Sequence, residues 1–345
     1  MTHPSERSSQ SVTVLGGGSF GTAIANIAAS NGHRVKLWMR SEKQAEDILT
    51  QGENSRYLPG YKLNANLKPV LDLNDAVADA DCVFVAVPSK AFRSVVEQAV
   101  LLLQAHTALV SLTKGIEPGS FRLMSQLLHD LAPAHDIGVI SGPNLAKEIA
   151  DHQISATVVA SYSQPLRGSI QQMLSSKYFR VYGNPDIYGV ELAGALKNIY
   201  AIITGLAAAL GMAENTRAAI ITRSLAEMSR FAVRLGANPM TFLGLAGVGD
   251  LIVTCSSKLS RNYRVGYYIG EGDTLKQAIK RIGETAEGIN TLRMVHQKAA
   301  EMGIYMPLAN GLYAIIYQDK PIADVAGQLM SGDLAQDVEF MGAGI

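Results

Sequence analysis

The segment from Ser11 to Arg40, SVTVLGGGSFGTAIANIAASNGHRVKLWMR, constrains the fold of this chain more than any other stretch. A short apolar run ends in Gly16, Gly18 and Gly21, and an Ala- and Ile-rich helical pattern follows. An Asn-Gly stop and a second apolar run complete the segment. A strand, a glycine turn, a helix and a second strand in this order predict a unit that binds a dinucleotide. A glycine-rich turn that binds nothing does not explain three glycines at these offsets.

The three glycines have separate physical roles. Gly16 permits the tight turn, Gly18 removes a Cβ so that the backbone can touch a pyrophosphate, and Gly21 lets the helix lie close to the strand. The helix that follows presents free N–H groups and the positive end of its dipole to the phosphates. We therefore expect a phosphate-binding turn here.

The end of the second strand indicates which dinucleotide is used. NAD-binding folds place an acidic residue there to hold the ribose 2′-hydroxyl, roughly 20 residues beyond the glycines. This chain has Met39-Arg40-Ser41 and no acid before Glu42. A guanidinium and a hydroxyl suit a 2′-phosphate. We expect NADPH to be used in preference to NADH, with NADH also accepted; the alternative is that Arg40 is a solvated loop charge.

Composition excludes several classes of function. The 345 residues favour two domains, and the balance of 30 basic against 30 acidic residues leaves no electrostatic footprint for nucleic acid or an anionic membrane. The polar N-terminus lacks an apolar signal core, so we expect a cytoplasmic protein. Two cysteines form neither a disulfide framework nor a metal set, and the histidines show no ligand spacing and are expected at the surface.

The first half of the chain alternates between strand and helix patterns, which predicts an α/β fold with a doubly wound Rossmann sheet. Apolar strand patterns lie at 81–87, 108–112, 137–140, 157–160 and 179–182, with the last two expected at the sheet edge, and 50–68 is expected to be a polar loop. Beyond Asn184-Pro185 only helical patterns remain. We therefore predict a dinucleotide-binding domain at 1–185 and an all-α substrate domain at 186–345.

Two turns of the predicted sheet carry candidate ligand-binding residues. Lys114 comes just after the strand that ends at Leu112, and Gly142 to Asn144 follow the strand that ends at Ile140. Ligands of open α/β sheets bind beyond the carboxyl ends of the strands. Both turns should therefore lie at the same edge as the glycine turn, although Lys114 could also be a plain surface charge.

Lys197 is the one charged residue between Glu191 and Glu214, in a helical pattern too short to span a bilayer and expected to be buried. A lysine among small apolar residues pairs with a carboxylate or faces a ligand, unless it reaches a nearby surface. Asp250, isolated among apolar residues, is the obvious partner. Asn198 could bind a substrate hydroxyl or cap a neighbouring helix.

Ser260-Arg261-Asn262 has the pattern of a helix start, with Ser260 as the N-cap. Backbone N–H groups, a hydroxyl, an amide and a guanidinium together form a good phosphate site. The alternative is an ordinary capped surface helix. A crevice lined by Lys114, Lys197 and Asp250 would favour the phosphate site.

With these motifs the chain resembles the bacterial NAD(P)-dependent sn-glycerol-3-phosphate dehydrogenases. The resemblance covers roughly residues 12–320 and rests on GGGSFGTAIA, SLTKGIE, SGPNLAKEI, ELAGALKNIYAI, GLAGVGDLIVTCSS, SRNYRVG and AEGI, in that order. It implies a Rossmann domain followed by a helical substrate domain. It also implies reduction of dihydroxyacetone phosphate to sn-glycerol 3-phosphate, which feeds phospholipid synthesis.

The resemblance also implies roles for individual residues, with Lys197 as the proton donor and acceptor. The residues that match substrate contacts are Lys114, Gly142, Asn144, Lys197, Asp250, Thr254, Ser260, Arg261 and Asn262. Those that match cofactor contacts are Gly16, Gly18, Ser19, Phe20, Gly21, Arg40, Lys114, Ala146, Arg261, Thr285 and Glu287. Gly17 stands where the family usually has Ala, Phe20 where it has Trp or Tyr, and Asn144-Leu145 where a Ser- or Thr-Phe pair is commoner.

The expected mechanism is hydride transfer from the nicotinamide to the ketone carbon, with Lys197 protonating the alkoxide, Lys114 stabilising its charge and Asp250 orienting Lys197. No metal is expected, because the lysines supply the positive charge. The alternatives are a β-hydroxyacid dehydrogenase, which would not need the phosphate site, and a non-catalytic NADPH-sensing protein, which would not need Lys197 and Asp250. We expect no nucleic-acid partner and no membrane insertion, and the apolar helices leave room for a homodimer.

Overall fold

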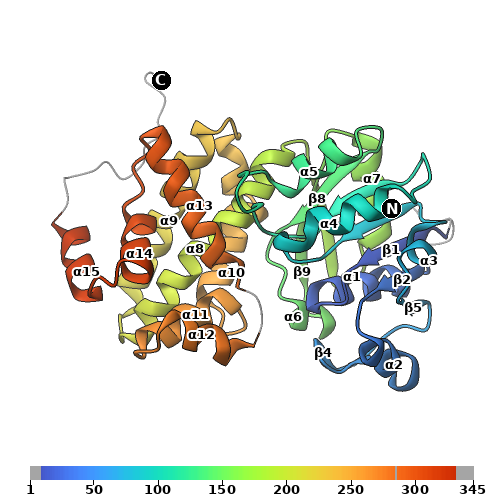
Figure 1. The fold of residues 1–345 in the computed structure, drawn as a ribbon, viewed down its shortest axis with the longest axis horizontal. Coiled ribbons are helices and arrows are strands. Elements are labelled where there is room, and N and C mark those ends of the chain that lie inside the picture. The colour runs from blue at the N-terminus through green and yellow to red at the C-terminus, as the bar shows by residue number, and fades with distance from the viewer. Residues whose placement is uncertain (1–8, 284–285, 332–345) are drawn as a thin grey trace. The chain divides into compact units, whose positions relative to one another are not determined.

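The computed structural model describes residues 9–283 and 286–331 of the chain. The chain divides between Glu191 and Leu192 into two compact parts, here called the sheet unit and the helical unit (Figure 1). The sheet unit is a Rossmann-like α/β fold and the helical unit follows it, which confirms the predicted fold class. The domain limits predicted at 185 and 186 stay a prediction.

The sheet unit is organised around an eight-stranded sheet in the order β10-β9-β8-β7-β6-β1-β2-β5. Its strands are β1 Ser11–Leu15, β2 Arg34–Trp38, β5 Leu67–Val70, β6 Cys82–Val85, β7 Ala108–Ser111, β8 Ile137–Ser141, β9 Ser155–Ala160 and β10 Phe179–Asn184. Neighbouring strands are parallel except for β8 and β9, which pair antiparallel. The strands β1, β6, β7 and β8 therefore end at one common edge, as the sequence predicts.

Helices cover both faces of this sheet. They are α1 Ser19–Ser30, α2 Glu42–Gln51, α3 Leu73–Val77, α4 Ser89–Val100, α5 Met124–Leu131, α6 Ala146–Ala150 and α7 Gln164–Leu174. Side chains of one strand alternate between two cores. Val14 belongs to the core that also contains residues of α1 and α7, and its neighbour Leu15 belongs to the core that contains residues of α4 and α5. A sheet covered on both faces explains why its strands read as continuous apolar runs.

Several elements differ from the sequence expectation. The stretch expected to be a polar loop contains the hairpin strands β3 Glu53–Asn54 and β4 Leu58–Lys62 and the first residues of the edge strand β5. Strand β5 carries Pro69, and an edge position tolerates proline because one side of the strand needs no N–H donor. The helical pattern at residues 120–131 of the sequence forms helix α5 only from Met124, because the residues before it form a loop closed by a bridge between Ile116 and Leu123.

The helical unit is built around α8, Ile187–Ala209, most of which lies in this unit. Its other elements are α9 Glu214–Arg234, a 3₁₀ turn Pro239–Leu243, a π turn Leu245–Gly249, α10 Asp250–Ser256, α11 Arg261–Gly270, α12 Leu275–Ile282, α13 Glu287–Met302, α14 Pro307–Tyr317 and α15 Ile322–Met330. Helix α8 is long and apolar enough to cross a membrane, but 83% of its most apolar window is buried inside the protein. It is therefore packed as a core helix.

Each unit contains a buried glutamate that binds the first N–H groups of a helix. In the sheet unit Glu191 accepts hydrogen bonds from the N–H and hydroxyl of Ser125 in the first turn of α5. In the helical unit Glu227 accepts from the N–H groups of Leu308 and Ala309 in the first turn of α14, at 2.6 and 3.2 Å. Burial raises the pKa of each carboxyl to about 7.

One histidine lies elsewhere than predicted. His33 is buried next to the start of β2, and its Nδ1 accepts a hydrogen bond from the backbone N–H of Gln10. We expected His33 at the surface. It can be buried because its imidazole is hydrogen-bonded to the backbone of Gln10, and buried polar groups are tolerated when they have a partner. The two cysteines, Cys82 and Cys255, are buried free thiols.

Candidate functional site

The glycine turn, residues 16–21, joins β1 to α1 at the carboxyl end of the sheet. Gly16 has φ +123°, and a Cβ there would lie 2.6 Å from the carbonyl oxygen of Ala86. A Cβ on Gly21 would lie 2.2 Å from the carbonyl oxygen of Gly16. Neither position accepts a side chain, because backbone atoms cannot move aside cheaply. The turn therefore has the geometry expected from the glycine spacing.

The surroundings of Gly18 leave space for a phosphate group at the start of α1. Gly18 is the N-cap of α1 and makes no side-chain cap bond, and a Cβ there would meet no protein atom within 4 Å. The first N–H groups of a helix have no partner within the helix, so they are available to an anion. Ser19 and Phe20 form the first turn of α1, with Phe20 packed against the apolar core. This end of α1 could hold the pyrophosphate of a dinucleotide.

Arg40 lies directly after β2, in the position where a group could read the ribose. Its side chain is exposed. The next residue, Ser41, caps helix α2 by accepting the N–H of Gln44 at 3.3 Å. The position after β2 thus offers a guanidinium and no carboxylate until Glu42.

The two turns beyond β7 and β8 meet, as the parallel strands predict. Lys114 Nζ donates to the carbonyl oxygen of Gly142 at 2.7 Å, and the hydroxyl of Thr113 ties the same turn to the carbonyl of Val87 at 2.6 Å. Lys114 is half-buried. An ammonium is therefore fixed at the carboxyl edge of the sheet, where ligands of such sheets bind.

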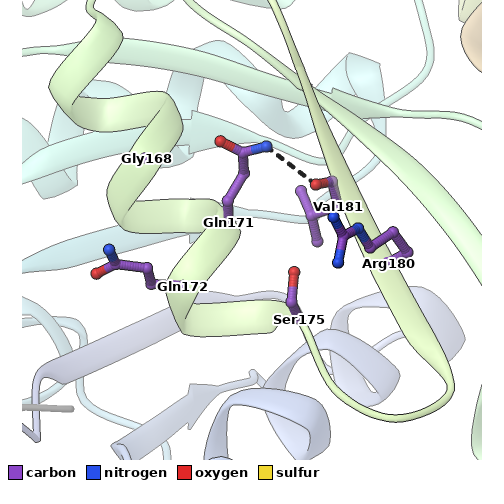
Figure 2. A pocket seen from close by; sticks show the side chains of 6 residues that line it. All are labelled: Gly168, Gln171, Gln172, Ser175, Arg180 and Val181. Atoms are coloured by element: carbon purple, nitrogen blue, oxygen red, sulfur yellow. Dashed lines mark hydrogen bonds between the residues drawn. The ribbon is translucent and has the colours of Figure 1, made fainter. Parts of the chain in front are cut away.

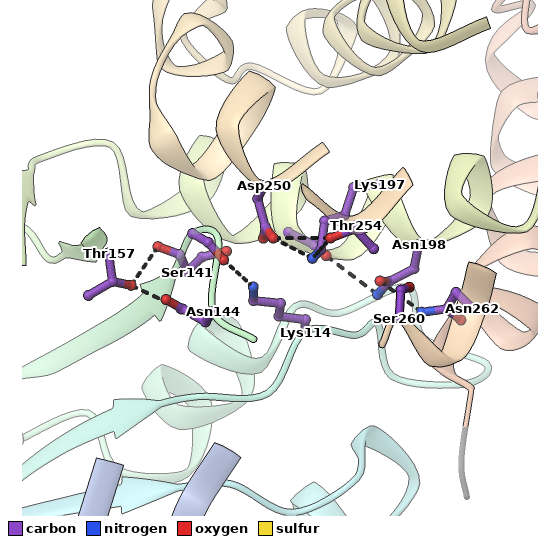
Figure 3. A network of polar contacts seen from close by, with 12 residues as sticks. Lys114, Ser141, Asn144, Thr157, Lys197, Asn198, Asp250, Thr254, Ser260 and Asn262 are labelled. Carbon is purple, nitrogen blue, oxygen red and sulfur yellow. Dashed lines mark hydrogen bonds and ion pairs between the residues drawn. The ribbon is translucent and has the colours of Figure 1, made fainter. Parts of the chain in front are cut away.

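Asn144 is held by β8 and β9. Its amide donates to the hydroxyl of Thr157 at 2.9 Å, and that hydroxyl donates to the carbonyl of Ser141 at 3.1 Å (Figure 3). Asn144 Oδ1 and the hydroxyl of Ser141 are buried, with no hydrogen-bond partner among the described residues. A buried hydroxyl thus lies at the end of β8 and a buried acceptor in the turn that follows it. The residue pattern did not single out Ser141 and Thr157 as site residues, since small polar residues of strands are common in cores.

Lys197, Asp250 and Thr254 form the lysine cluster of the helical unit. Lys197 Nζ lies 2.5 Å from Asp250 Oδ1 and 2.5 Å from the hydroxyl of Thr254 (Figure 3). The side chains of Lys197 and Asp250 are 7% and 1% exposed. The predicted ion pair is present, and Thr254 lies one helical turn after Asp250 because α10 carries both. A buried ammonium with one carboxylate and one hydroxyl is held in a fixed orientation.

The π turn before α10 places this aspartate. Residues Leu245–Gly249 are wound as a π turn, and Asp250 is the first residue of the α-helix that follows. Such turns add a residue to the helix and redirect the side chains beyond it. The glycine-rich sequence LAGVG permits this conformation. Asp250, the residue after the π turn, is fully buried.

Asn262 makes two hydrogen bonds within the helical unit. Its Nδ2 donates to Asn198 Oδ1 at 2.9 Å (Figure 3). Its Oδ1 accepts from the N–H of Gly288 at 3.0 Å. Ser260 caps α11 as predicted, by accepting the N–H of Tyr263 at 3.3 Å. Arg261, the first residue of α11, is exposed. Asn262 therefore fixes the start of α13 against α8.

Two of the remaining predicted cofactor contacts, Ala146 and Glu287, lie at helix starts. Ala146 is the first residue of α6 and packs against the core of the sheet unit, and Glu287 is the first residue of α13. Thr285 lies outside the described residues. Among residues 9–283 and 286–331 there is no group of three or more His, Cys, Asp or Glu placed to hold a metal.

A hollow of about 360 Å³ lies between α7 and β10 and is lined by Gly168, Gln171, Gln172, Ser175, Arg180 and Val181 (Figure 2). Gln171 donates across it to the carbonyl oxygen of Val181 at 3.1 Å. The lining contains one titratable side chain, Arg180. It lacks the paired groups that proton transfer needs, so the chemistry belongs to the sites described above.

Comparison with known proteins identifies a family that uses a dinucleotide, in agreement with the glycine turn described above. Residues 11–166 match the family model for the N-terminus of NAD-dependent glycerol-3-phosphate dehydrogenase, and residues 186–327 match the model for its C-terminus. Glycerol-3-phosphate dehydrogenase (NAD(P)+) of Pseudomonas paraeruginosa is 57% identical over 332 residues, 96% of this chain and 97% of the relative.

Solved structures agree. Glycerol-3-phosphate dehydrogenase of Coxiella burnetii is 36% identical with a TM-score of 0.90, and the match covers 94% of this chain and 99% of that one. The enzyme of Saccharomyces cerevisiae is 28% identical with a TM-score of 0.82, over 93% and 99% of the two chains. The chain therefore belongs to the NAD(P)-dependent glycerol-3-phosphate dehydrogenase family.

Proposed function

We propose that this chain catalyses the reversible, NAD(P)H-dependent reduction of dihydroxyacetone phosphate to sn-glycerol 3-phosphate, which supplies phospholipid synthesis. The observation that carries the proposal is the buried lysine cluster, in which one ammonium is oriented by a carboxylate and a hydroxyl. When bound, the reduced nicotinamide supplies the hydride for the ketone carbon. The family and the names of the relatives support this substrate.

Lys197 is the proposed general acid. It gives the proton on Nζ to the substrate oxygen as the ketone becomes an alcohol, and it takes that proton back in the reverse direction. Asp250 and Thr254 accept two N–H groups of the ammonium, which leaves the third for the substrate. Asp250 also supplies the negative charge that makes a buried ammonium tolerable.

The proposed substrate contacts also include groups that bind oxygen atoms without transferring a proton. Lys114 stabilises the negative charge on the substrate oxygen, and Arg261 binds the phosphate. The other proposed substrate contacts are Gly142, Asn144, Ser260 and Asn262. Fixing the phosphate holds the carbonyl in place, which can lower the barrier by several kcal/mol.

The proposed cofactor contacts are Gly16, Gly18, Ser19, Phe20, Gly21, Arg40, Lys114, Ala146, Arg261, Thr285 and Glu287. Arg40 favours NADPH because its guanidinium can pair with a 2′-phosphate. We further propose that the protein acts in the cytoplasm as a homodimer and does not insert into a membrane.

A substrate panel tests the proposal. The purified chain is incubated with NADPH or NADH and with one of three substrates: dihydroxyacetone phosphate, dihydroxyacetone or a β-keto acid. Oxidation of the cofactor is followed by the loss of the absorbance of its reduced nicotinamide. We expect turnover with dihydroxyacetone phosphate alone, and faster with NADPH than with NADH. Turnover of the β-keto acid instead would identify a β-hydroxyacid dehydrogenase. Binding of NADPH without any turnover would identify a non-catalytic sensor.

A further inference from the structure

Gln44 on α2 reaches from the ribose end of the dinucleotide-binding region to the glycine turn. Its Nε2 donates to the carbonyl oxygen of Gly17 at 2.5 Å and to Asn54 Oδ1 at 3.2 Å. The side chain is 6% exposed. A glutamine buried at this depth is costly unless its hydrogen bonds are made, so these bonds define its position.

Asn54 completes a closed network around the turn. Its Nδ2 donates to the same carbonyl of Gly17 at 3.0 Å and to the hydroxyl of Thr22 at 2.8 Å. Asn54 and Thr22 are both 0% exposed. The carbonyl of Gly17 therefore receives two side-chain donors, and the network also fastens the first turn of α1.

Gly17 leaves no room for a side chain where Gln44 lies. A Cβ on Gly17 would be 2.6 Å from Gln44 Nε2 and 3.2 Å from the end of Met39. The backbone of Gly17 is outside the set of positive-φ glycines, so alanine brings no backbone strain there. A methyl group at this position would act by displacing the Gln44 amide, and both of its hydrogen bonds would be lost.

We propose that Gln44 is a positioning residue for the cofactor, because it holds the glycine turn in the conformation that binds the pyrophosphate. The absence of a side chain at Gly17 leaves the space that the Gln44 amide occupies. Gln44 is fixed at the start of α2 by the Ser41 cap, directly after Arg40. Gln44 thus ties the phosphate-binding turn to the segment proposed to read the ribose. It touches neither the substrate nor the reacting atoms.

The first test replaces Gln44 with Met, which keeps the length of the side chain and removes its donors. Binding of NADPH and of NADH is titrated by fluorescence, because direct binding separates this role from catalysis. We expect the Kd of NADPH to rise about tenfold while kcat at saturating cofactor stays within about twofold. The matched control is Gln51→Met at the exposed end of the same helix, which should leave the Kd unchanged.

A double-mutant cycle tests the pairing of Gln44 with Gly17. Gly17→Ala should weaken NADPH binding by about tenfold in the native background, and by less than about twofold when Gln44 is already Ala. Gly168→Ala on α7, where an added methyl meets nothing within 4 Å, is the control for the methyl group. Equal effects of Gly17→Ala in both backgrounds would overturn the proposal.

The proposal rests on the proposed use of NADPH, and the two can fail separately. If the native chain binds no NADPH, the proposed function fails. If the native chain binds it and Gln44→Met binds it equally well, only the role of Gln44 fails. Should Gln44→Met melt too low for titration, Gly17→Ala decides: unchanged NADPH affinity in that variant would overturn the proposal, and a loss of affinity at unchanged kcat would support it.

Discussion

Two buried polar regions of this protein, the glycine turn and the lysine cluster, differ in the charge that they carry. Around the glycine turn the buried side chains, Gln44, Asn54 and Thr22, are all neutral and bind backbone or one another. In the lysine cluster a buried ammonium faces a buried carboxylate. A pyrophosphate brings its own charge, so N–H groups and a helix dipole suffice to bind it. A proton donor must itself carry the charge, and it needs a buried counter-charge.

This comparison predicts that substitutions in the lysine cluster change kcat and that substitutions around the glycine turn change cofactor affinity. The largest effect is expected for Lys197→Met. A general acid contributes roughly 10²- to 10⁴-fold to a rate, so kcat should fall by about 10³-fold or more. The Kd of NADPH should stay within about twofold. Stopped-flow reduction of dihydroxyacetone phosphate and fluorescence titration measure the two quantities.

The Lys197→Met variant also leaves Asp250 buried without its ammonium, which can cost about 3–5 kcal/mol of stability. The double variant Lys197→Met/Asp250→Asn removes that charge as well. It should regain thermal stability without regaining turnover. Recovery of turnover in the double variant, or near-normal turnover in the single one, would remove Lys197 from the mechanism.

Asp250→Asn should have the next largest effect. The amide keeps an oxygen that can accept a hydrogen bond from Lys197 but removes the negative charge, so the ammonium loses its counter-charge and part of its orientation. We expect kcat to fall by roughly ten- to hundredfold. Thr254→Val, which removes the uncharged acceptor, should cost less. If Thr254→Val costs more than Asp250→Asn, orientation rather than charge dominates the cluster.

Arg40→Asp tests the opposite side of the comparison. Losing a charge-assisted hydrogen bond to a 2′-phosphate, and placing a carboxylate there, should lower NADPH affinity by roughly ten- to hundredfold. NADH affinity should change little, because its 2′-hydroxyl can bind a carboxylate. The ratio of kcat/KM for the two cofactors measures the shift. Lys43→Asp on the exposed start of α2 is the control for charge alone, and an equal shift in that variant would contradict a specific role for Arg40.

The sequence predicted charged groups better than neutral ones. Lys197 and Asp250 stood out because a lone charge in an apolar stretch needs a partner, and each was the obvious partner of the other. Gln44 and Asn54 gave no such signal, because polar residues in a helix and a turn usually face water. Their partner Gly17 lies 27 and 37 residues away in sequence, so only the fold brings them together.

The same limit applies to the fold. Strands buried on both faces were predicted from their apolar runs. Both β9 and β10 were expected at the sheet edge, but only β10 is an edge strand, because β9 lies between β10 and β8. The antiparallel direction of β9 was not predicted, since strand direction leaves no pattern in the apolar residues. Strand β5 was missed because LKPV has neither a continuous run nor an alternation.

The smallest expected effect concerns Glu227, and it is an effect on the pH dependence of stability. Glu227 is a buried acid of the helical unit whose hydrogen bonds come from neutral donors: two backbone N–H groups and the hydroxyl of Tyr200 at 3.1 Å. Burial raises its pKa from 4.5 to about 7. The folded chain therefore holds this proton at pH values where the unfolded chain has released it. The stabilising contribution is complete below about pH 4.5 and is lost as the pH rises through about 7.

Glu227→Gln removes this titration and keeps the shape of the side chain. The free energy of unfolding of the native chain minus that of the variant should therefore decrease between pH 4.5 and pH 7, by on the order of 1–3 kcal/mol, and be constant above pH 8. Urea unfolding at pH 4.5, 5.5, 6.5 and 8 measures it, with the exposed Glu301→Gln on α13 as the control. A difference that grows with pH would mean that Glu227 is ionised in the folded state. The helical unit would then hold a second buried charge, and the lysine cluster would no longer be distinguished by the charge that it carries.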